Sequence, residues 1–268
     1  MWLDAIWRYP VKSAAGERLE AAHLGELGVP GDRLVYVVDG RGRTVSARNR
    51  PKLLGLRGGV DADGSPTVDG HTWDDPAAAE LVRAAAGPST RLVSAGSYER
   101  FDILPLLVAT DGAATEAGLD IRRLRPNLVI GGVDRLAERG WEGRFLRVGD
   151  AVVGLDTLRG RCIVTTYDPD TVEQDVQVLI DIQRRFAGSL ALNAWTVPRR
   201  HATSKRVRVE AARDLLETGD MTVAGIAERC GFGSPETMRR AFRRVPAGTP
   251  TEIRARFRST GDEARIPA

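Results

Sequence analysis

The feature that most constrains this chain is an abrupt change of pattern at Pro198. Before that residue, short apolar runs rich in β-branched residues are separated by turn residues, which is typical of strands. After it comes the basic, proline-led stretch PRRHATSKR, and then apolar residues at helical spacing. We therefore predict a β-rich part that ends at 198, a linker at 199–206 and a helical part at 207–268.

The part before Pro198 is predicted to be a barrel-like α+β fold. A strand is expected at the N-terminus up to Pro10, and a hairpin across a glycine-rich turn over 33–48. Asp75, Pro76 and Gly87 delimit a predicted helix at 74–86. A second helix is expected at 173–186, with Val176, Leu179, Ile180 and Phe186 on one side. Further strands are expected in KLLGLRGGV (52–60), RPNLVIGG (125–132), FLRVGDAVVGLDTL (145–158), RCIVTT (161–166) and SLALNAWTV (189–197).

Charge and cysteine content narrow the class of protein. The net charge is +3, but residues 199–268 carry 15 Lys and Arg against 9 Asp and Glu. Such asymmetry indicates either a nucleic-acid partner for the tail or a solvated basic surface. Cys162 and Cys230 lie in different parts, so a disulfide framework is not expected. No apolar run is long enough for a membrane helix, and we expect a cytoplasmic protein without a membrane partner.

The stretch from Arg159 to Thr171, RGRCIVTTYDPDT, is the most informative single segment. It holds the only cysteine of the first 198 residues. A thiol at the end of a predicted strand, followed by a carboxylate-rich turn, is compatible with a metal ligand, a nucleophile or an ordinary buried cysteine. The segment alone leaves these three alternatives open.

Separated motifs of residues 6–197 carry a family resemblance. They stand in the order YPVKS (9–13), GDR (31–33), SARN (46–49), RLRPNLVI (123–130), WEG with RVGD (141–150) and RCIVTTYDPDT (161–171). This set resembles the MOSC family with its N-terminal β-barrel domain, the group that contains the mitochondrial amidoxime-reducing component. The resemblance implies an N-terminal domain at 1–90 and a MOSC domain at 91–198.

The resemblance also implies a molybdenum cofactor, in which a pyranopterin dithiolene carries a phosphate. By motif, Cys162 matches the cysteine that ligates molybdenum, and five further residues match positions that contact the cofactor: Lys12, Ser13, Arg33, Arg125 and Asn127. The chemistry agrees, because thiophilic metals take a thiolate and a guanidinium at Arg161 favours the thiolate form. The alternatives are surface charges for the basic residues, a turn for Asn127 and a core position for Cys162.

Redox members of the family reduce N-hydroxylated small molecules with electrons from a partner protein. Such a reaction needs a proton source, and Asp168 is the candidate catalytic residue beside Cys162. The segment DPDT is also typical of a turn capped by its own aspartates. A sensor that binds a ligand without turnover, and a scaffold with an empty site, are the competing hypotheses. The scaffold predicts a pocket that is not lined jointly by Lys12, Arg33, Arg125 and Cys162.

Three positions depart from the family pattern. Arg159 stands where many relatives have a second cysteine, which excludes a two-cysteine site. Val172 stands where the turn usually continues with glycine. The strand that normally follows SLALNAW is replaced by PRRHATSKR, so we expect a barrel that lacks one strand unless the segment near Val207 substitutes for it.

The helical part is predicted to contain a helix-turn-helix. Thr222 caps VAGIAERC, glycines form the turn, and Ser234 with Pro235 opens the next helix, whose Met238, Ala241 and Phe242 pack inward. The pattern resembles the second helix-turn-helix of AraC-type transcriptional regulators, and the first unit of that family is absent. DNA contact is predicted for Ser234, Pro235, Glu236, Arg239, Arg240, Arg243 and Arg244.

Overall fold

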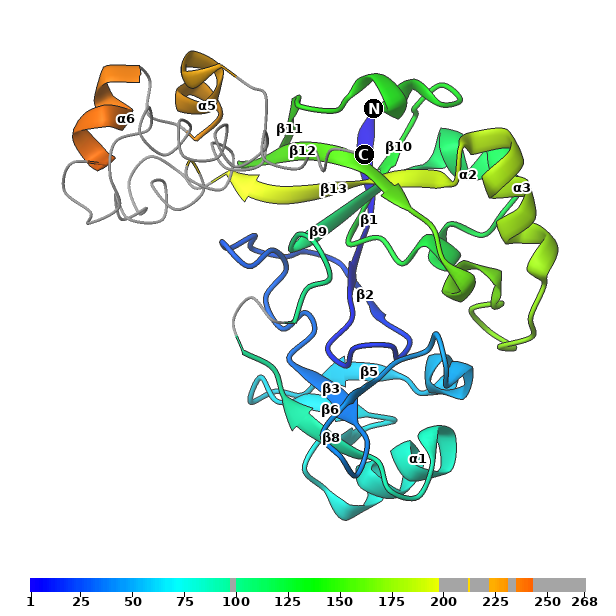
Figure 1. Cartoon of the computed structure of the whole chain (residues 1–268). Helices are drawn as coiled ribbons and strands as arrows, with labels where there is room; N and C mark the ends of the chain where they lie inside the picture. Colours follow the sequence, from blue (N-terminus) through cyan, green and yellow to red (C-terminus); the bar gives the residue numbers. More distant parts are fainter. Residues whose placement is uncertain (97–99, 198–211, 213–221, 231–234, 243–268) are drawn as a thin grey trace, which may run out of the picture. The chain divides into compact units, whose positions relative to one another are not determined.

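The structure is a computed structural model that describes residues 1–96, 100–197, 212, 222–230 and 235–242 (Figure 1). The chain divides into two compact units, Met1–Val197 and Pro198–Ala268. In the described residues no helix is long and apolar enough to cross a membrane.

The larger unit is built on a seven-stranded sheet with the order β11-β12-β13-β9-β10-β1-β2. β9 and β10 run parallel, and the other neighbouring strands are antiparallel. The strands are β1 (Trp2–Arg8), β2 (Glu17–Leu19), β9 (Leu106–Thr110), β10 (Leu128–Gly131), β11 (Phe145–Val148), β12 (Ala151–Gly160) and β13 (Ser189–Val197). Their inward side chains, among them Leu106, Val108, Leu128, Ile130 and Leu192, form the core of this sheet.

The parallel pair is joined by a helical crossover. Thr110 ends β9 and accepts a hydrogen bond from the Ala113 N–H, which caps α2 (Asp111–Ala117). Gly118 ends α2 in the left-handed conformation, and the 3-10 helix η2 (Ile121–Leu124) leads into β10. Antiparallel strands can be joined by a short turn, whereas parallel strands such as β9 and β10 require a crossover connection.

Two three-stranded sheets form the rest of the larger unit. One contains β3 (Val35–Val38), β4 (Thr44–Val45) and β8 (Arg91–Ser94), and the other contains β5 (Gly58–Val60), β6 (Pro66–Val68) and β7 (His71–Thr72). The helix α1 (Pro76–Ala86) packs on them through Ala78 and Val82. It begins at the Asp75 cap and ends at Gly87, as predicted. The antiparallel pairing of β3 and β4 confirms the predicted hairpin.

The predicted α+β class is confirmed, but the barrel is not closed. In the described part of the chain the strands form open sheets, and β11 and β2 are the edges of the largest. β13 pairs with β12 on one side and with β9 on the other, so both of its edges are occupied by described strands. The segment near Val207 lies outside the described residues.

Three sequence predictions about this unit were wrong in detail. The RCIVTT segment is not a strand, because β12 ends at Gly160 and η4 (Ile163–Thr166) follows Cys162 directly. Most of KLLGL lies in the 3-10 helix η1 (Pro51–Gly55), and only Gly58–Val60 of that segment is a strand. The predicted helix at 173–186 begins later, as α3 (Val176–Phe186), because the Asp175 carboxylate caps it at the Gln177 N–H.

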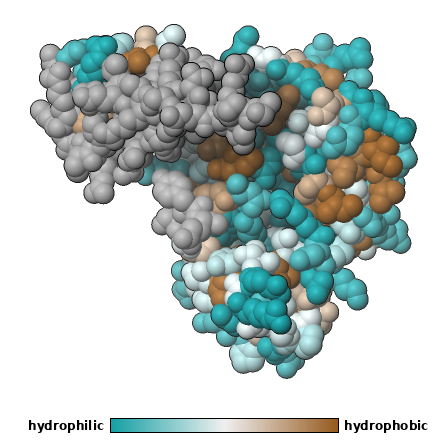
Figure 2. Space-filling model, in the orientation of Figure 1, coloured by the Kyte–Doolittle hydropathy of each residue, from teal (hydrophilic) through white to brown (hydrophobic). Residues whose placement is uncertain are grey.

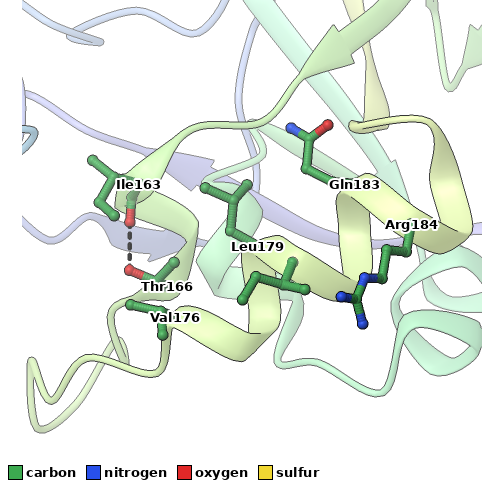
Figure 3. Close-up of a pocket in the computed structure, with 7 residues that line it drawn as sticks. Ile163, Thr166, Val176, Leu179, Gln183 and Arg184 are labelled. Atoms are coloured by element: carbon green, nitrogen blue, oxygen red, sulfur yellow. Dashed lines mark hydrogen bonds between the residues drawn. The ribbon is translucent and has the colours of Figure 1, made fainter.

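The apolar positions expected on one side of α3 do not all face the core. Ile182 and Phe186 are buried, whereas Val176 and Ile180 are 54% and 39% exposed. With Ile163 and Thr166 of η4, the exposed side of α3 lines an apolar groove of about 330 Å³ (Figure 3). The hydrophobic surface over α3 in Figure 2 corresponds to this side of the helix.

The smaller unit contains α5 (Val223–Arg229) and α6 (Pro235–Phe242). The Thr222 hydroxyl accepts a hydrogen bond from the Gly225 N–H, which confirms the predicted cap. Met238 and Phe242 are buried as predicted, together with Ile226 and Ala227. The side chain of Ala241 and the turn glycines lie outside the described residues.

Candidate functional site

Tyr9 is the centre of the candidate site. It follows β1 and is 3% exposed, and its backbone N–H donates to the Asp32 carboxylate at 2.7 Å. Its hydroxyl donates to the Pro126 carbonyl at 3.2 Å. The guanidinium groups of Arg125 and Arg33 lie 4.4 Å and 5.4 Å from the centroid of its ring. Tyr9 therefore holds two of the arginines predicted to contact a cofactor.

Burial raises the pKa of Tyr9 to about 12 and outweighs the opposing charges of Arg125 and Arg33. The phenol is consequently neutral at physiological pH, and it serves as a hydrogen-bond donor and as an aromatic surface.

Three of the predicted cofactor positions have an uncommon backbone conformation. Ser13, Arg33 and Arg125 have φ angles of 76°, 53° and 56°, in the left-handed region that non-glycine residues rarely adopt. The surrounding contacts hold these conformations: the Arg33 N–H donates to the Tyr9 carbonyl, and the Arg125 side chain donates to the Ala14 carbonyl at 2.7 Å. Strained backbone that neighbouring contacts over-determine is typical of ligand sites.

Arg161 connects this arrangement to Cys162. Its Nη2 donates to the Leu124 carbonyl at 2.8 Å, whereas its Nε is sealed from solvent without a hydrogen-bond partner. Burial lowers the pKa of Arg161 to about 10, and the sulfur of Cys162 opposes this shift while Arg159 and Arg125 reinforce it. Arg161 is thus a cation with an unused donor next to the candidate metal ligand.

Cys162 is a free, half-buried thiol between β12 and η4. Its backbone is extended, and its carbonyl accepts from the Thr165 N–H at 2.9 Å, which forms the turn. The thiol is therefore on a short rigid connection between two elements and is not enclosed in the core.

Lys12 and Arg159 meet at Asp102, together with Arg48. The Asp102 carboxylate lies 2.8 Å from Lys12 Nζ, 3.3 Å from Arg159 and 3.5 Å from Arg48. Burial of Asp102 would raise its pKa, but the Lys12 hydrogen bond and the three cations together lower it below its usual range. Asp102 is therefore a carboxylate that partly neutralises these cations.

The basic cluster consists of Lys12, Arg33, Arg48, Arg125, Arg159 and Arg161. Asp32 pairs with Arg33 and Asp102 pairs with three of the others, so positive charge is in excess. Sequence reasoning assigned a role to four of these six residues, Lys12, Arg33, Arg125 and Arg161. Tyr9 and Asp32 stand inside the YPVKS and GDR motifs but were not assigned a role, and no sequence signal pointed to Asp102.

Asn127 is positioned differently from the other predicted cofactor residues. It is fully buried, its Oδ1 accepts from the Leu107 N–H at 3.1 Å, and its Nδ2 donates to the Trp7 carbonyl at 3.2 Å. Its amide thus ties β1 to β9 in the sheet. These contacts occupy both ends of the side chain and favour a structural role.

Asp168 forms the turn that the DPDT segment indicates. Its Oδ1 accepts from the N–H groups of Asp170 and Thr171 at 3.0 Å each, and its Oδ2 lies 3.1 Å from Arg123. The backbone hydrogen bonds, with help from the charge of Arg123, lower the pKa of Asp168. These contacts are those of the capped turn, and the low pKa disfavours a protonated carboxyl.

A polar cavity of about 320 Å³ lies beside the cluster. Its lining includes Tyr9, Arg57, Arg122, Arg123, Arg125 and Tyr167. Of the residues predicted to contact a cofactor, Arg125 lines this cavity, whereas Lys12, Arg33 and Cys162 do not, which is the outcome that the scaffold hypothesis predicts for this cavity. Within the described ranges, no group of three or more His, Cys, Asp and Glu could hold a metal ion.

In the smaller unit, α6 presents part of the predicted DNA-binding set. Glu236 and Arg239, one helical turn apart, form an ion pair at 3.5 Å and are 52% and 43% exposed. Pro235 is half-buried at the start of α6. Ser234, Arg243, Arg244 and the side chain of Arg240 lie outside the described residues.

Models of three domain families match the chain: the MOSC N-terminal beta barrel domain over residues 1–89, the MOSC domain over 92–221 and a helix-turn-helix domain over 199–256. The chain belongs to the MOSC family. The MOSC match reaches past Val197, so it includes residues that the helix-turn-helix match shares. This MOSC protein therefore combines the two MOSC domains with a helix-turn-helix of the AraC type.

The individual relatives are of two kinds, amidoxime-reducing components and a transcriptional regulator. Mitochondrial amidoxime-reducing component 1 of Homo sapiens is 24% identical over 62% of this chain, and component 2 of Bos taurus is 25% identical over 63%. The matches cover 66% and 67% of those proteins. An HTH-type transcriptional regulator of Mycobacterium tuberculosis is 51% identical over 20% of this chain and 20% of its own length.

Among solved structures, the DNA-binding domain of AdpA in complex with a target DNA matches at 41% identity. The match covers 22% of this chain and 53% of that chain, with a TM-score of 0.21.

Proposed function

We propose that the MOSC part binds a molybdenum cofactor through the Cys162 thiolate and reduces N-hydroxylated small molecules. The observation that carries the proposal is the convergence of Arg33 and Arg125 on the ring of Tyr9, together with the unpartnered, buried Nε of Arg161 next to Cys162. The assignment of residues 1–90, 91–198, 199–206 and 207–268 to two MOSC domains, a linker and a helix-turn-helix domain is part of the same proposal.

The residues of the basic cluster and Cys162 are chemically suited to a molybdenum cofactor. The unpartnered Nε of Arg161 is a buried donor that a polar ligand would satisfy, which removes the penalty of leaving it unpaired. Excess positive charge suits an anionic phosphate, and guanidinium groups bind phosphate through two parallel hydrogen bonds. One half-buried thiol suits a cofactor that brings the remaining metal ligands with it.

When bound, the cofactor would supply two-electron redox chemistry. Reduction of an N-hydroxylated base breaks its N–O bond, consumes two electrons and two protons, and releases the amine and water. A flavin- or cytochrome-type partner would supply the electrons. The protein's own residues would hold the phosphate and the ring system at Lys12, Arg33, Arg125 and Arg161. The protons would come from solvent, which reaches the half-buried Cys162.

Metal analysis tests the proposal. The protein is expressed in a host that makes the cofactor, and molybdenum and pterin are measured in the wild type, Cys162→Ser and Cys230→Ser. We expect both in the wild type and in Cys230→Ser, and a loss of most molybdenum in Cys162→Ser. Equal molybdenum in all three, or none in any of them, would contradict the proposal.

A second candidate function is a transcriptional regulator whose MOSC part senses a ligand. The helix-turn-helix match and the exposed Arg239 of α6 favour it. It predicts DNA retention that changes when cofactor is bound and that weakens with salt. DNA retention that does not respond to salt, or that is the same with and without cofactor, would count against it.

A further inference from the structure

The helix α3 is apolar over a wider arc than its packing in the core uses. The side that bears Val178, Ile182 and Phe186 packs into the core. Because successive residues of a helix are about 100° apart, the exposed Val176 and Ile180 lie on a different side of α3. A helix that packs on one core needs a single apolar stripe. α3 therefore presents a second apolar face, which the described residues leave exposed.

This second apolar face has the residue spacing of a helix-pairing surface. Val176, Leu179, Ile180 and Gln183 stand at positions i, i+3, i+4 and i+7, and all four line the groove in Figure 3. Residues with this spacing form one row along a helix, and a second helix can pack a row of its own against it. The groove is thus shaped to receive an amphipathic helix.

The two ends of this face carry opposite charges. Glu173 and Asp175 are exposed at the N-terminal end of α3, and Arg184 and Arg185 are exposed at its C-terminal end. Among the described residues, no ion pair involves Asp175 or Arg184. A helix that binds here antiparallel to α3 therefore needs a basic C-terminal end and an acidic N-terminal end. The sequence of α3 itself meets this requirement.

An antiparallel copy of α3 matches the face residue by residue. With a two-fold axis between residues 179 and 180, Leu179 lies opposite the partner's Ile180, and Val176 lies opposite the partner's Gln183. The same register places Asp175 opposite the partner's Arg184. The symmetry makes each of these contacts twice. A parallel copy would instead bring like charges together at both ends.

We propose that a second copy of this chain binds the groove, so that α3 and the partner's α3 pair antiparallel in a homodimer. Seven residues line the groove in each copy, whereas a standard interface uses about 20–30 residues on each side. The dimer is therefore weak and reversible. It carries two helix-turn-helix domains, which paired DNA half-sites require. The interface does not depend on a cofactor at Cys162.

Sedimentation of the full-length protein under reducing conditions, over a wide range of concentration, tests the proposal. We expect the wild type to change from monomer to dimer as its concentration rises. Ile180→Glu places a carboxylate at the centre of the interface in both copies and should abolish the dimer. Ile103→Glu makes the same substitution at another exposed isoleucine and should leave the dimer unchanged. A wild type that is monomeric at every concentration, or a dimer that persists in Ile180→Glu, overturns the proposal.

The predicted ion pair tests the antiparallel register. Asp175→Asn keeps an oxygen that can cap α3, and Arg184→Gln removes the cation. Each variant should weaken the dimer by about threefold to tenfold, because an exposed ion pair is lost twice. The double variant should be no weaker than either single variant, since each of them already breaks the same pairs. Losses that multiply in the double variant would overturn the proposed pairing.

Two further measurements keep the test decisive. A wild type that stays monomeric in solution and floats with phosphatidylcholine vesicles would assign the groove to a lipid surface and overturn the dimer. In the wild type, the amides of α3 should exchange hydrogen more slowly at a concentration above the dissociation constant than at one below it. Unchanged exchange overturns the proposal even if Ile180→Glu fails to fold.

Discussion

The guanidinium of Arg125 lies over the buried ring of Tyr9, with its Cζ 4.4 Å from the ring centroid. The Tyr9 hydroxyl at the same time binds the carbonyl of Pro126, the residue after Arg125. The ring thus fixes both the side chain and the backbone of the segment that enters β10. Because Arg125 holds a left-handed backbone conformation, this double contact explains how the conformation persists.

Tyr9→Phe keeps the ring and removes the hydroxyl. Near neutral pH the variant should be about 1 kcal/mol less stable, because the Pro126 carbonyl loses its donor. The folded-state pKa of Tyr9, about 12, is above the value of roughly 10 in an unfolded chain. The phenol's contribution is therefore fully present below about pH 10 and is lost as pH rises towards 12.

The free energy of unfolding of the wild type should accordingly fall by roughly 2 kcal/mol more than that of Tyr9→Phe between about pH 10 and pH 12. Urea denaturation of both proteins at a series of pH values measures this difference. Parallel curves would show that Tyr9 does not titrate differently in the folded protein.

Asp168 provides a test that separates a capped turn from a proton donor. Asp168→Asn keeps an oxygen that accepts from the N–H groups of Asp170 and Thr171, whereas Asp168→Ala does not. If Asp168 serves only to cap the turn, the rate at which Asp168→Asn reduces an N-hydroxylated substrate should be within about twofold of the wild-type rate. Asp168→Ala should unfold at a lower temperature than the wild type. A general acid would instead cost about 10² to 10⁴ in rate in both variants. Turnover and thermal unfolding of cofactor-loaded protein distinguish the two.

Arg239 and Glu236 allow a charge test of DNA binding. Glu236→Gln removes the acid that pairs with Arg239, so it should tighten binding to a DNA duplex. Arg239→Ala should weaken binding and reduce the slope of log affinity against log salt by about 0.9 if the side chain meets a phosphate. Fluorescence anisotropy at several salt concentrations measures both, with Arg41→Ala in the MOSC part as a matched loss of charge. An equal effect of Arg41→Ala would show that only net charge matters.

Individual helices and strands were predictable where a short sequence pattern determines them. The Asp75 cap with Pro76 and Gly87 defines α1, and the apolar run VYVV before the glycine-rich turn defines β3. The strand predicted after Cys162 was wrong, because IVTT has strand propensity but a tertiary contact overrides it. Arg123 donates to the Thr166 carbonyl at 2.9 Å, so this backbone group is bound by a side chain and not by a neighbouring strand.

The candidate site was predictable only through its motifs. Lys12, Arg33 and Arg125 were identified because they stand in recurring short sequences, and the structure connects Arg33 and Arg125 through Tyr9. Asp102 has no local signal, since its role arises only when separate loops fold together. The orphaned Nε of Arg161 is likewise a property of packing that no sequence pattern encodes.

Val172 has a backbone conformation that is unfavourable for valine. Its φ is 61°, and a β-branched side chain in the left-handed region is strained, whereas glycine adopts this conformation freely. Val172→Gly should therefore raise the free energy of unfolding by about 1 kcal/mol, after allowance for the greater freedom of glycine in the unfolded chain. Val172→Ala keeps the Cβ and should gain less. Urea denaturation at neutral pH orders the three proteins, and a Gly variant less stable than the wild type would show that the packing of the Val172 side chain outweighs the strain.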